Sequence, residues 1–204
     1  MHRLPIILRE DSKLRRIFAL REDDIQKLLA VENVEQQRLA RTPSRNKLLI
    51  RMLIATGLRV AELSNLRIED IDLENGQAII WMGKGRKQRT VLIDPDTITL
   101  LRSFCQGKDP KGLLIGLKPR QIQNVVKHYA KAAGVRWAEH VSPHRLRDTF
   151  AVHWVRHQGD LESLRRLLGH NSLATTQRYL VFEFDEVKAQ YDRIFGHKEK
   201  RLYE

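Results

Sequence analysis

The hydrophobic pattern of this chain has a helical period over most of its 204 residues and changes to a strand-like period between Ile68 and Ile93. Short β-rich runs lie there at 71–73, 78–81 and 90–93, separated by ENG at 74–76 and by GKGRKQR at 83–89. Turn-forming residues between such short runs favour hairpins and therefore antiparallel pairing. The chain is predicted to be mainly α with a small antiparallel β-sheet, an α+β fold.

Helices are predicted on both sides of this sheet from apolar spacing and from residues that begin or end helices. Asp94, Ser142, Asp160 and Ser172 are predicted N-caps, and Gly169 is a predicted helix end. The helix that Ser172 begins is expected to carry Tyr179. The helices are predicted at 21–40, 44–57, 61–66, 119–133, 143–159, 161–168 and 182–195, with others after Pro95 and Ser172.

Composition restricts the class of partner and the compartment. The net charge is +12 and the isoelectric point is near 10.1. Both favour a polyanion, with duplex DNA as the leading candidate. Cys105 is the single cysteine, which excludes an intrachain disulfide and favours a reducing compartment. No apolar run approaches the length of a membrane span, and the first residues do not form a signal peptide. The prediction is a soluble cytoplasmic protein without a membrane partner.

The first candidate site residues are His144 and Arg147, three positions apart on the helix that Pro143 opens. Residues at this spacing lie on one helix face. Free backbone N–H groups in the first turn of a helix favour an anion. An imidazole and a guanidinium at that place are suited to binding phosphate. Taken alone, however, the pair is better explained as an ordinary charged helix start.

Tyr179 follows the run LGHNSLATTQR at 168–178, so its phenol is close in sequence to His170. A turn histidine such as His170 is more often exposed or capping than functional. A lone tyrosine is more often a packing residue, and Tyr129, Tyr191 and Tyr203 are competing phenols. Packing with its apolar neighbours in the last predicted helix explains Tyr191 well.

Further cations lie upstream. Arg59 follows Gly57 and could pair with Glu62 three residues later, a surface pair of small energy. The expected hairpin loop carries a dense set of basic residues, which suits contacts to nucleic acid or a solvated turn. These residues are Lys84, Arg86, Lys87 and Arg89.

Four segments in one order give the chain a family resemblance: TGLRVAEL at 56–63, the GKG hairpin at 83–85, PHRLRDTFA at 143–151, and LGHNSLATTQRY at 168–179. They resemble the catalytic domain of tyrosine recombinases, also called the phage integrase family. The resemblance spans residues 21–195. It implies a DNA breaking-rejoining fold, with residues 1–20 as a basic arm or linker and 21–204 as the catalytic domain, its C-terminal helix and a tail.

The resemblance also implies roles for individual residues. Tyr179 corresponds to the nucleophile, giving a 3′-phosphotyrosyl link and a free 5′-hydroxyl without metal, nucleotide or other cofactor. Arg59 and Arg147 correspond to the pair that holds the non-bridging oxygens. Lys84 corresponds to the general acid, His144 to a proton-transfer group and His170 to a further phosphate donor. Glu62 corresponds to a supporting acidic residue that orients the site.

The chain departs from the family pattern in two ways. Asp148 stands where relatives commonly have a histidine, and it is expected to alter local electrostatics while remaining outside the reacting set. No separate N-terminal DNA-clamping domain is expected within this sequence, where only a short basic arm precedes the matching segment, which leaves open a naturally minimal recombinase or a fragment. The partners expected are double-stranded DNA, further copies of the chain as a tetramer on DNA, and accessory proteins. The target site and the biological role stay open.

Three other functions are compatible with parts of this sequence. A type IB topoisomerase uses similar chemistry to relax DNA without partner exchange. A non-enzymatic DNA-binding module would not need the hydroxyl of Tyr179. A zinc protein is suggested by His153 and His157 at helical spacing, but no neighbouring glutamate or third ligand accompanies them, so a core or surface explanation is favoured.

Overall fold

The computed structural model describes residues 17–31, 43–82, 87–180, 191–192 and 194–195. Its helices and strands confirm the predicted class: mostly helical with a three-stranded antiparallel sheet. The elements are α1 (Glu22–Ala30), α2 (Pro43–Thr56), α3 (Val60–Asn65), η1 (Ile68–Asp70), β1 (Ile71–Asp72), β2 (Gln77–Met82), β3 (Lys87–Leu92), α4 (Pro95–Cys105), α5 (Pro119–Ala132), η2 (Ala138–His140), α6 (Pro143–Arg156), α7 (Leu161–Leu168) and α8 (Leu173–Gln177).

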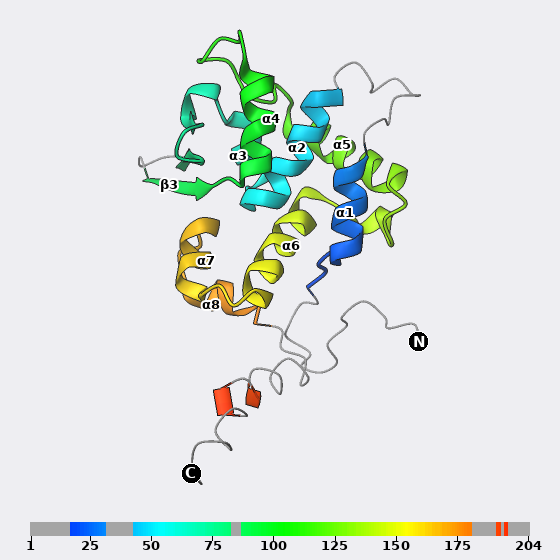
Figure 1. Ribbon diagram of the computed structural model, residues 1–204, viewed down its shortest axis with the longest axis vertical. Helices are drawn as coiled ribbons and strands as arrows, with labels where there is room; N and C mark the ends of the chain where they lie inside the picture. Colours follow the sequence, from blue (N-terminus) through cyan, green and yellow to red (C-terminus); the bar gives the residue numbers. More distant parts are fainter. Residues whose placement is uncertain (1–16, 32–42, 83–86, 181–190, 193, 196–204) are drawn as a thin grey trace, which may run out of the picture.

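Helix α2 lies at the centre of the larger core. Leu48, Leu49, Met52 and Leu53 are each at most 1% exposed, and α2 contacts α1, α4, α5 and α6. A helix that is apolar over most of its circumference must be covered on several sides. Figure 1 shows α2 beside α4 and α5, with α6 running below it toward α7.

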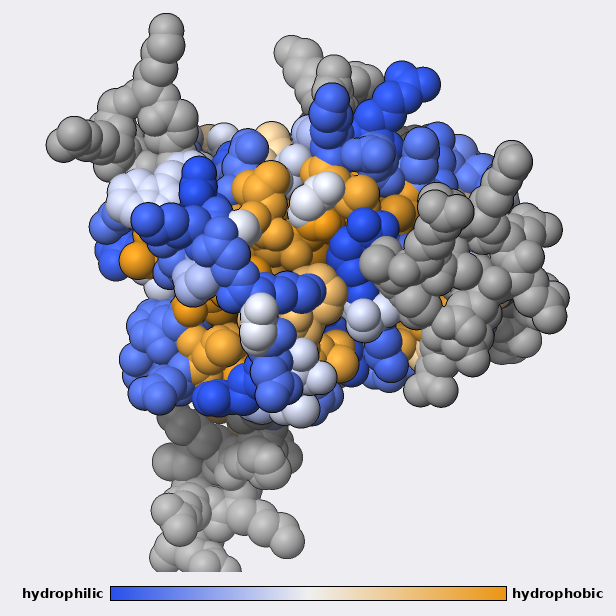
Figure 2. All heavy atoms as spheres, turned by 90° about the horizontal axis from the view of Figure 1, so that it is seen from above, coloured by the Kyte–Doolittle hydropathy of each residue, from blue (hydrophilic) through white to orange (hydrophobic). Residues whose placement is uncertain are grey.

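The sheet has the strand order β1-β2-β3, with both pairs antiparallel. Alternation along β2 sets its two faces, because successive side chains of a strand point to opposite sides. Ala78 and Ile80 are buried, whereas Ile79 and Trp81 are exposed. The space-filling view also shows apolar residues gathered at the surface with hydrophilic residues around them (Figure 2). The inner face of the sheet therefore closes the core, and the outer face leaves apolar side chains accessible.

A second, smaller core lies under α6, α7 and α8. Its buried members are Ala151, Val152, Leu164, Leu168 and Tyr179. Residues 17–20 pack against the folded domain, although the sequence places them in the basic arm: Phe18 and Leu20 belong with the larger core. Ile17 and Ala19 contact the smaller core, and the Leu20 N–H donates to Thr149 Oγ1 over 2.9 Å.

Several helix bounds differ from the predicted ones. Helix α2 begins at Pro43, one residue before Ser44, where the helix is predicted to begin, and α6 ends at Arg156 rather than at Gly159. Helix α1 ends at Ala30, followed by an extended Val31, so the prediction of one continuous helix over 21–40 is wrong. Most of the predicted 182–195 helix lies outside the described residues. Helix α8 ends at Gln177, so the prediction that it carries Tyr179 is wrong. The Tyr179 N–H bonds to Thr176 O, three residues back, which tightens the chain into a turn and directs the phenol toward α6.

Candidate active site

Arg147 joins the ends of two helices. It lies one turn into α6, after the Ser142 cap, and is 4% exposed. Its Nη1 donates to Gly57 O over 2.6 Å, and its Nη2 donates to Leu168 O over 2.6 Å. Burial, reinforced by Arg59, lowers the pKa of Arg147 to about 10. The guanidinium therefore remains charged at neutral pH.

The carbonyl groups that Arg147 binds are free because α2 and α7 both end in glycine. Gly57 and Gly169 have φ values of +61° and +65°, the left-handed conformation that commonly ends a helix. The last carbonyls of a helix have no partner within it. Arg147 satisfies two of them and thereby fixes both helix ends around its own charge.

Glu62 links two further arginines. Its Oε1 accepts from Arg59 Nη1 over 2.9 Å and from Arg89 Nη1 over 2.7 Å, while Oε2 accepts from Arg89 Nη2 over 2.8 Å. Burial would raise the pKa of Glu62, but Arg89 and Arg59 together lower it to about 2. The predicted Arg59–Glu62 pair is thus present, within a larger network than the sequence suggested.

Arg89 is buried, which corrects its assignment to the exposed basic loop. It lies within β3, its side chain is 8% exposed, and its Nε donates to Leu167 O over 2.8 Å. Lys84 and Arg86 lie outside the described residues. Lys87 begins β3, and its side chain is likewise outside the described part. The structure therefore places the Arg89 side chain against Glu62.

His170 lies against the cationic cluster, which consists of the guanidinium groups of Arg59, Arg89 and Arg147. Its Nε2 lies 3.2 Å from Arg147 Nη2, and its Nδ1 lies 3.0 Å from Thr176 Oγ1. Burial, together with Arg147 and Arg59, lowers the pKa of His170 to about 4, so the ring is neutral at pH 7. Because an arginine can only donate, Nε2 accepts from Arg147 here and Nδ1 carries the proton. Thr176 was not found by the sequence argument.

Tyr179 is buried and donates its hydroxyl to a carboxylate. The residue is 2% exposed, and its OH lies 2.9 Å from Asp148 Oδ1. Its ring stacks on His170 with centroids 6.3 Å apart and an interplanar angle of 13°. Burial, with a contribution from Asp148, raises the pKa of Tyr179 to about 12. The phenol is therefore protonated at neutral pH.

Asp148 has contacts that the sequence argument missed. Its side chain is fully buried, with Arg145 Nη1 3.4 Å and His144 Nε2 3.7 Å from Oδ2, and Arg178 Nη2 4.0 Å from Oδ1. The structure thus places Asp148 against Tyr179, although the sequence left it outside the reacting set. The available signal was its position directly after Arg147.

The predicted site residues fall into two neighbouring groups. Arg59, Arg147 and His170 meet at the end of α7, with Glu62 behind Arg59. His144 and Tyr179 meet instead on Asp148, where the imidazole of His144 is largely exposed. His144 and Arg147 consequently do not share a partner, despite their spacing on α6.

The competing tyrosines are placed differently from Tyr179. Tyr129 is buried in the larger core on α5. Tyr191 is 61% exposed and contacts the ring of Phe195, with centroids 4.7 Å apart. Tyr203 lies outside the described residues. Tyr179 is therefore the phenol that the described structure places beside the cationic cluster.

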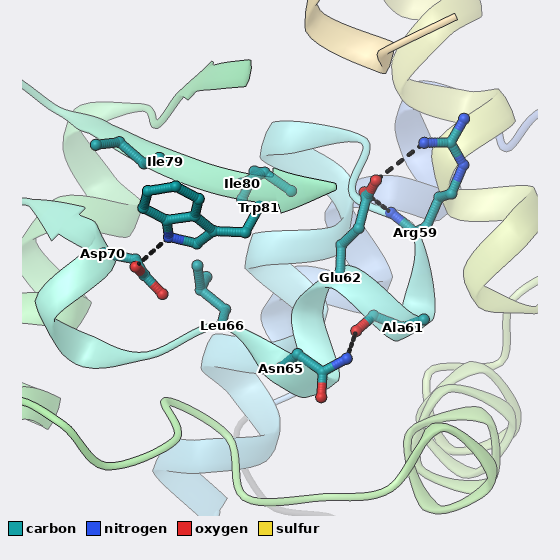
Figure 3. A pocket seen from close by; sticks show the side chains of 9 residues that line it. All are labelled: Arg59, Ala61, Glu62, Asn65, Leu66, Asp70, Ile79, Ile80 and Trp81. Atoms are coloured by element: carbon teal, nitrogen blue, oxygen red, sulfur yellow. Dashed lines mark hydrogen bonds and ion pairs between the residues drawn. The ribbon is translucent and has the colours of Figure 1, made fainter. Parts of the chain in front are cut away.

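A hollow of about 330 Å³ adjoins the cluster and is shown in Figure 3. Arg59 and Glu62 lie at one end of it, and Trp81 lies at the other, with Trp81 Nε1 donating to Asp70 Oδ1 over 2.8 Å. The hollow therefore extends from the cationic cluster along the outer, partly apolar face of β2.

The described residues contain no group of three or more His, Cys, Asp or Glu side chains arranged to hold a metal ion. The rings of His153 and His157 are in contact, with centroids 4.1 Å apart and an interplanar angle of 38°, and His153 Nδ1 lies 3.6 Å from Glu22 Oε2. No described helix combines the length and the apolar character that crossing a bilayer requires.

The sequence profile of the Phage integrase family matches residues 19–185, which is most of the chain. The chain belongs to the phage integrase family. Among its relatives, the tyrosine recombinase XerA of Pyrococcus furiosus is 32% identical over 185 residues, covering 86% of this chain and 61% of XerA. Tyrosine recombinase XerC of Alcanivorax borkumensis is 32% identical over 195 residues, covering 90% of this chain and 62% of XerC. This integrase-family chain thus spans about three-fifths of the length of these relatives.

Solved structures agree with this family membership. A crystal structure of XerA recombinase has a TM-score of 0.72 and 28% identity, covering 87% of this chain and 65% of that one. XerH site-specific recombinase, bound to its difH substrate before cleavage, has a TM-score of 0.69 and 28% identity, covering 89% and 55%. The catalytic domain of bacteriophage HP1 integrase, at 24% identity and a TM-score of 0.62, supports the fold alone and covers 87% and 95%. The predicted fold family is confirmed.

Proposed function

We propose that this chain is a site-specific DNA recombinase that cleaves and rejoins DNA through a 3′-phosphotyrosyl intermediate. The observation that carries the proposal is the meeting of Arg59, Arg147 and His170 at the end of α7, with the ring of Tyr179 stacked on His170. Membership of the integrase family and the tyrosine recombinase names of the relatives support it.

The two arginines fit the task of binding a phosphodiester. Arg147 uses its Nη atoms on two carbonyls and on His170, yet a guanidinium has five N–H donors. The Arg59 side chain is 43% exposed and can approach an anion from solvent. Fixed cations in a site sheltered from water stabilise charge that develops in a transition state. We assign Arg59 and Arg147 to the non-bridging oxygens, with Glu62 orienting Arg59.

His170 would donate to the same phosphate after a change of tautomer. In the free protein its Nε2 accepts from Arg147, as shown by the 3.2 Å contact. An anion between the two side chains would favour a proton on Nε2, and the Thr176 hydroxyl would then rotate to donate to Nδ1. Thr176 thus provides a partner for either tautomer, since a hydroxyl can both donate and accept.

The remaining roles rest on the family resemblance. Lys84 is proposed as the general acid for the departing 5′-oxygen, and His144 as a group for proton transfer. Arg86 and Lys87 are proposed to contact the DNA backbone. Because the covalent link conserves the energy of the phosphodiester, rejoining requires no nucleotide cofactor.

Double-stranded DNA is the proposed partner, in the cytoplasm, with further copies of the chain forming a tetramer on it and accessory proteins assisting. Tyr191, Ile194 and Phe195 expose more than half of their surfaces, which suits docking onto a neighbouring protomer. We expect a chain truncated after Leu180 to bind DNA with fewer copies, measured by mass photometry on duplex DNA. Equal assembly by the truncated chain would contradict this docking.

A nicked-duplex assay tests the activity and the nucleophile together. The chain is incubated with a pool of nicked duplexes that have randomised centres, and products are separated on denaturing gels. A covalent adduct is expected with the wild type and with Tyr191→Phe, and none with Tyr179→Phe. A gel shift without an adduct would replace this proposal by a DNA-binding module.

A further inference from the structure

Asp148 is a fully buried carboxylate in the middle of α6. Buried carboxylates are rare unless they are paired, because removing a charge from water is costly. The two carboxylate oxygens of Asp148 contact different partners. Oδ1 accepts the hydroxyl of Tyr179 at 2.9 Å, and Oδ2 faces Arg145 and His144 at 3.4 Å and 3.7 Å.

Tyr179 needs a proton acceptor if it is to attack phosphorus. With a pKa of about 12, only about one molecule in 100,000 carries a phenolate at pH 7. The Asp148 carboxylate already holds the hydroxyl proton in a hydrogen bond. The guanidinium groups of Arg145 and Arg178 lie near this carboxylate and compensate its charge.

We propose that Asp148 is the catalytic residue that takes the proton of the Tyr179 hydroxyl during strand cleavage and returns it during rejoining. This inference rests on the proposed function. As the Tyr179 oxygen forms its bond to phosphorus, the bond from phosphorus to the 5′-oxygen breaks. The phenolic proton moves to Asp148 Oδ1, and the departing 5′-oxygen receives a proton from the general acid. On rejoining, the 5′-oxygen bonds to phosphorus and its hydroxyl proton returns to the deprotonated general acid, which now acts as a base. The bond from phosphorus to the Tyr179 oxygen breaks, and Asp148 protonates the leaving phenolate.

In an alternative role, Asp148 assists the leaving 5′-oxygen rather than the nucleophile. Its Oδ2 lies 3.7 Å from His144 Nε2, and in this competing role Asp148 orients His144 for proton transfer to the 5′-oxygen. A duplex with sulfur at the 5′-bridging position separates the two roles. The sulfur leaves as a thiolate and needs no proton, whereas the nucleophile must still lose its proton.

The test measures single-turnover adduct formation by Asp148→Asn on matched oxygen and sulfur duplexes. Asparagine keeps the shape of the side chain but takes no proton. We expect the rate to fall about 100-fold or more on both duplexes, whereas Lys84→Ala, which removes the proposed general acid, should be slow on the oxygen duplex and recover on the sulfur one. A wild-type or faster rate for Asp148→Asn, or its recovery on sulfur, would overturn the assignment. DNA affinity and thermal melting of each variant check folding.

A second variant keeps the test decisive if Asp148→Asn does not fold. Asp148→His supplies a different base, whose protonation near pH 6.5 should appear as a new acid limb in the rate on the sulfur duplex. A pH profile identical to that of the wild type would contradict proton transfer to this position. If the wild type forms no adduct at all, the proposed function fails. If the wild type forms the adduct but the Asp148 variants do not show the expected rates and pH profile, only the assignment of Asp148 fails.

Discussion

Arg147 performs a structural task and a proposed chemical task with one guanidinium. It satisfies the terminal carbonyls of α2 and α7 through Gly57 O and Leu168 O, and this fixes its charge beside His170. The two tasks are coupled, because the same hydrogen bonds that complete the helix ends set the position of the charge.

Arg147→Lys should therefore affect both stability and activity. A lysine carries a point charge and cannot span two carbonyls as a planar guanidinium does. Leaving one buried carbonyl unpaired costs about 1–3 kcal/mol of unfolding free energy. Adduct formation should fall about 100- to 1,000-fold. Urea denaturation and the nicked-duplex assay measure the two effects, with Arg156→Lys at the exposed end of α6 as the control. An Arg147→Lys variant that forms the adduct at the wild-type rate would contradict a role of Arg147 in binding the phosphate.

Glu62 gives a prediction about acid stability. Its pKa is lowered to about 2 by Arg89 and Arg59 against the effect of burial, and a free glutamate titrates near about 4.3. A lowered carboxyl pKa contributes stability that is complete above the unfolded value and is lost as pH falls toward the folded value. The stability advantage of wild type over Glu62→Gln should shrink between pH 4.5 and 2. Urea midpoints measured at successive pH values test this, and a constant difference would contradict it.

At the scale of elements, local signals were sufficient where a cap contacts its own helix. The side chains of Asp94, Ser142, Asp160 and Ser172 each accept from a backbone N–H of the helix that they begin, as predicted. The C-terminal end of α8 was predicted wrongly, because Tyr179 lies beyond the helix and contacts Asp148, 31 residues away. Arg89 was misplaced for the same reason: its partner Glu62 is 27 residues away. Long-range partners of polar groups do not follow from spacing.

The glycine that ends α2 gives a prediction with a matched control in the same chain. Gly57 and Gly134 both have φ of +61°, so alanine at either costs about 1–2 kcal/mol of backbone strain. A Cβ on Gly57 would lie 2.6 Å from Phe150 Cδ1, whereas a Cβ on Gly134 meets no atom within 4 Å.

Gly57→Ala should consequently lose about 1–3 kcal/mol more stability than Gly134→Ala. It should also slow adduct formation, because Gly57 O anchors Arg147. Urea denaturation of both variants measures the difference. Equal losses of stability in the two variants, with equal rates of adduct formation, would show that the structure around Gly57 adjusts to the added Cβ without moving Arg147.

Across the whole molecule, the nucleophile belongs to the smaller of the two cores. Tyr179 packs with Ala151, Val152, Leu164 and Leu168, whereas the larger core extends over α1 to α6 and the sheet. Segments with few buried contacts open at lower free energy than the rest of a domain. The division leaves Arg59 and Glu62 at the start of α3, against the larger core, and the phenol on the part that opens more readily.

This division predicts the order of amide hydrogen exchange in the free protein. A phenol that is 2% exposed must become accessible before it can reach a phosphodiester, and opening of the turn after α8 accomplishes this without unfolding α2. Amides from Thr176 to Leu180 should therefore exchange well before those of Leu49 to Leu53, under conditions where α2 exchanges only by global unfolding. Hydrogen exchange followed by NMR measures both segments in one experiment. Protection of Tyr179 equal to that of α2 would mean that the tyrosine is released only with the whole fold, and that the smaller core is not an independent unit.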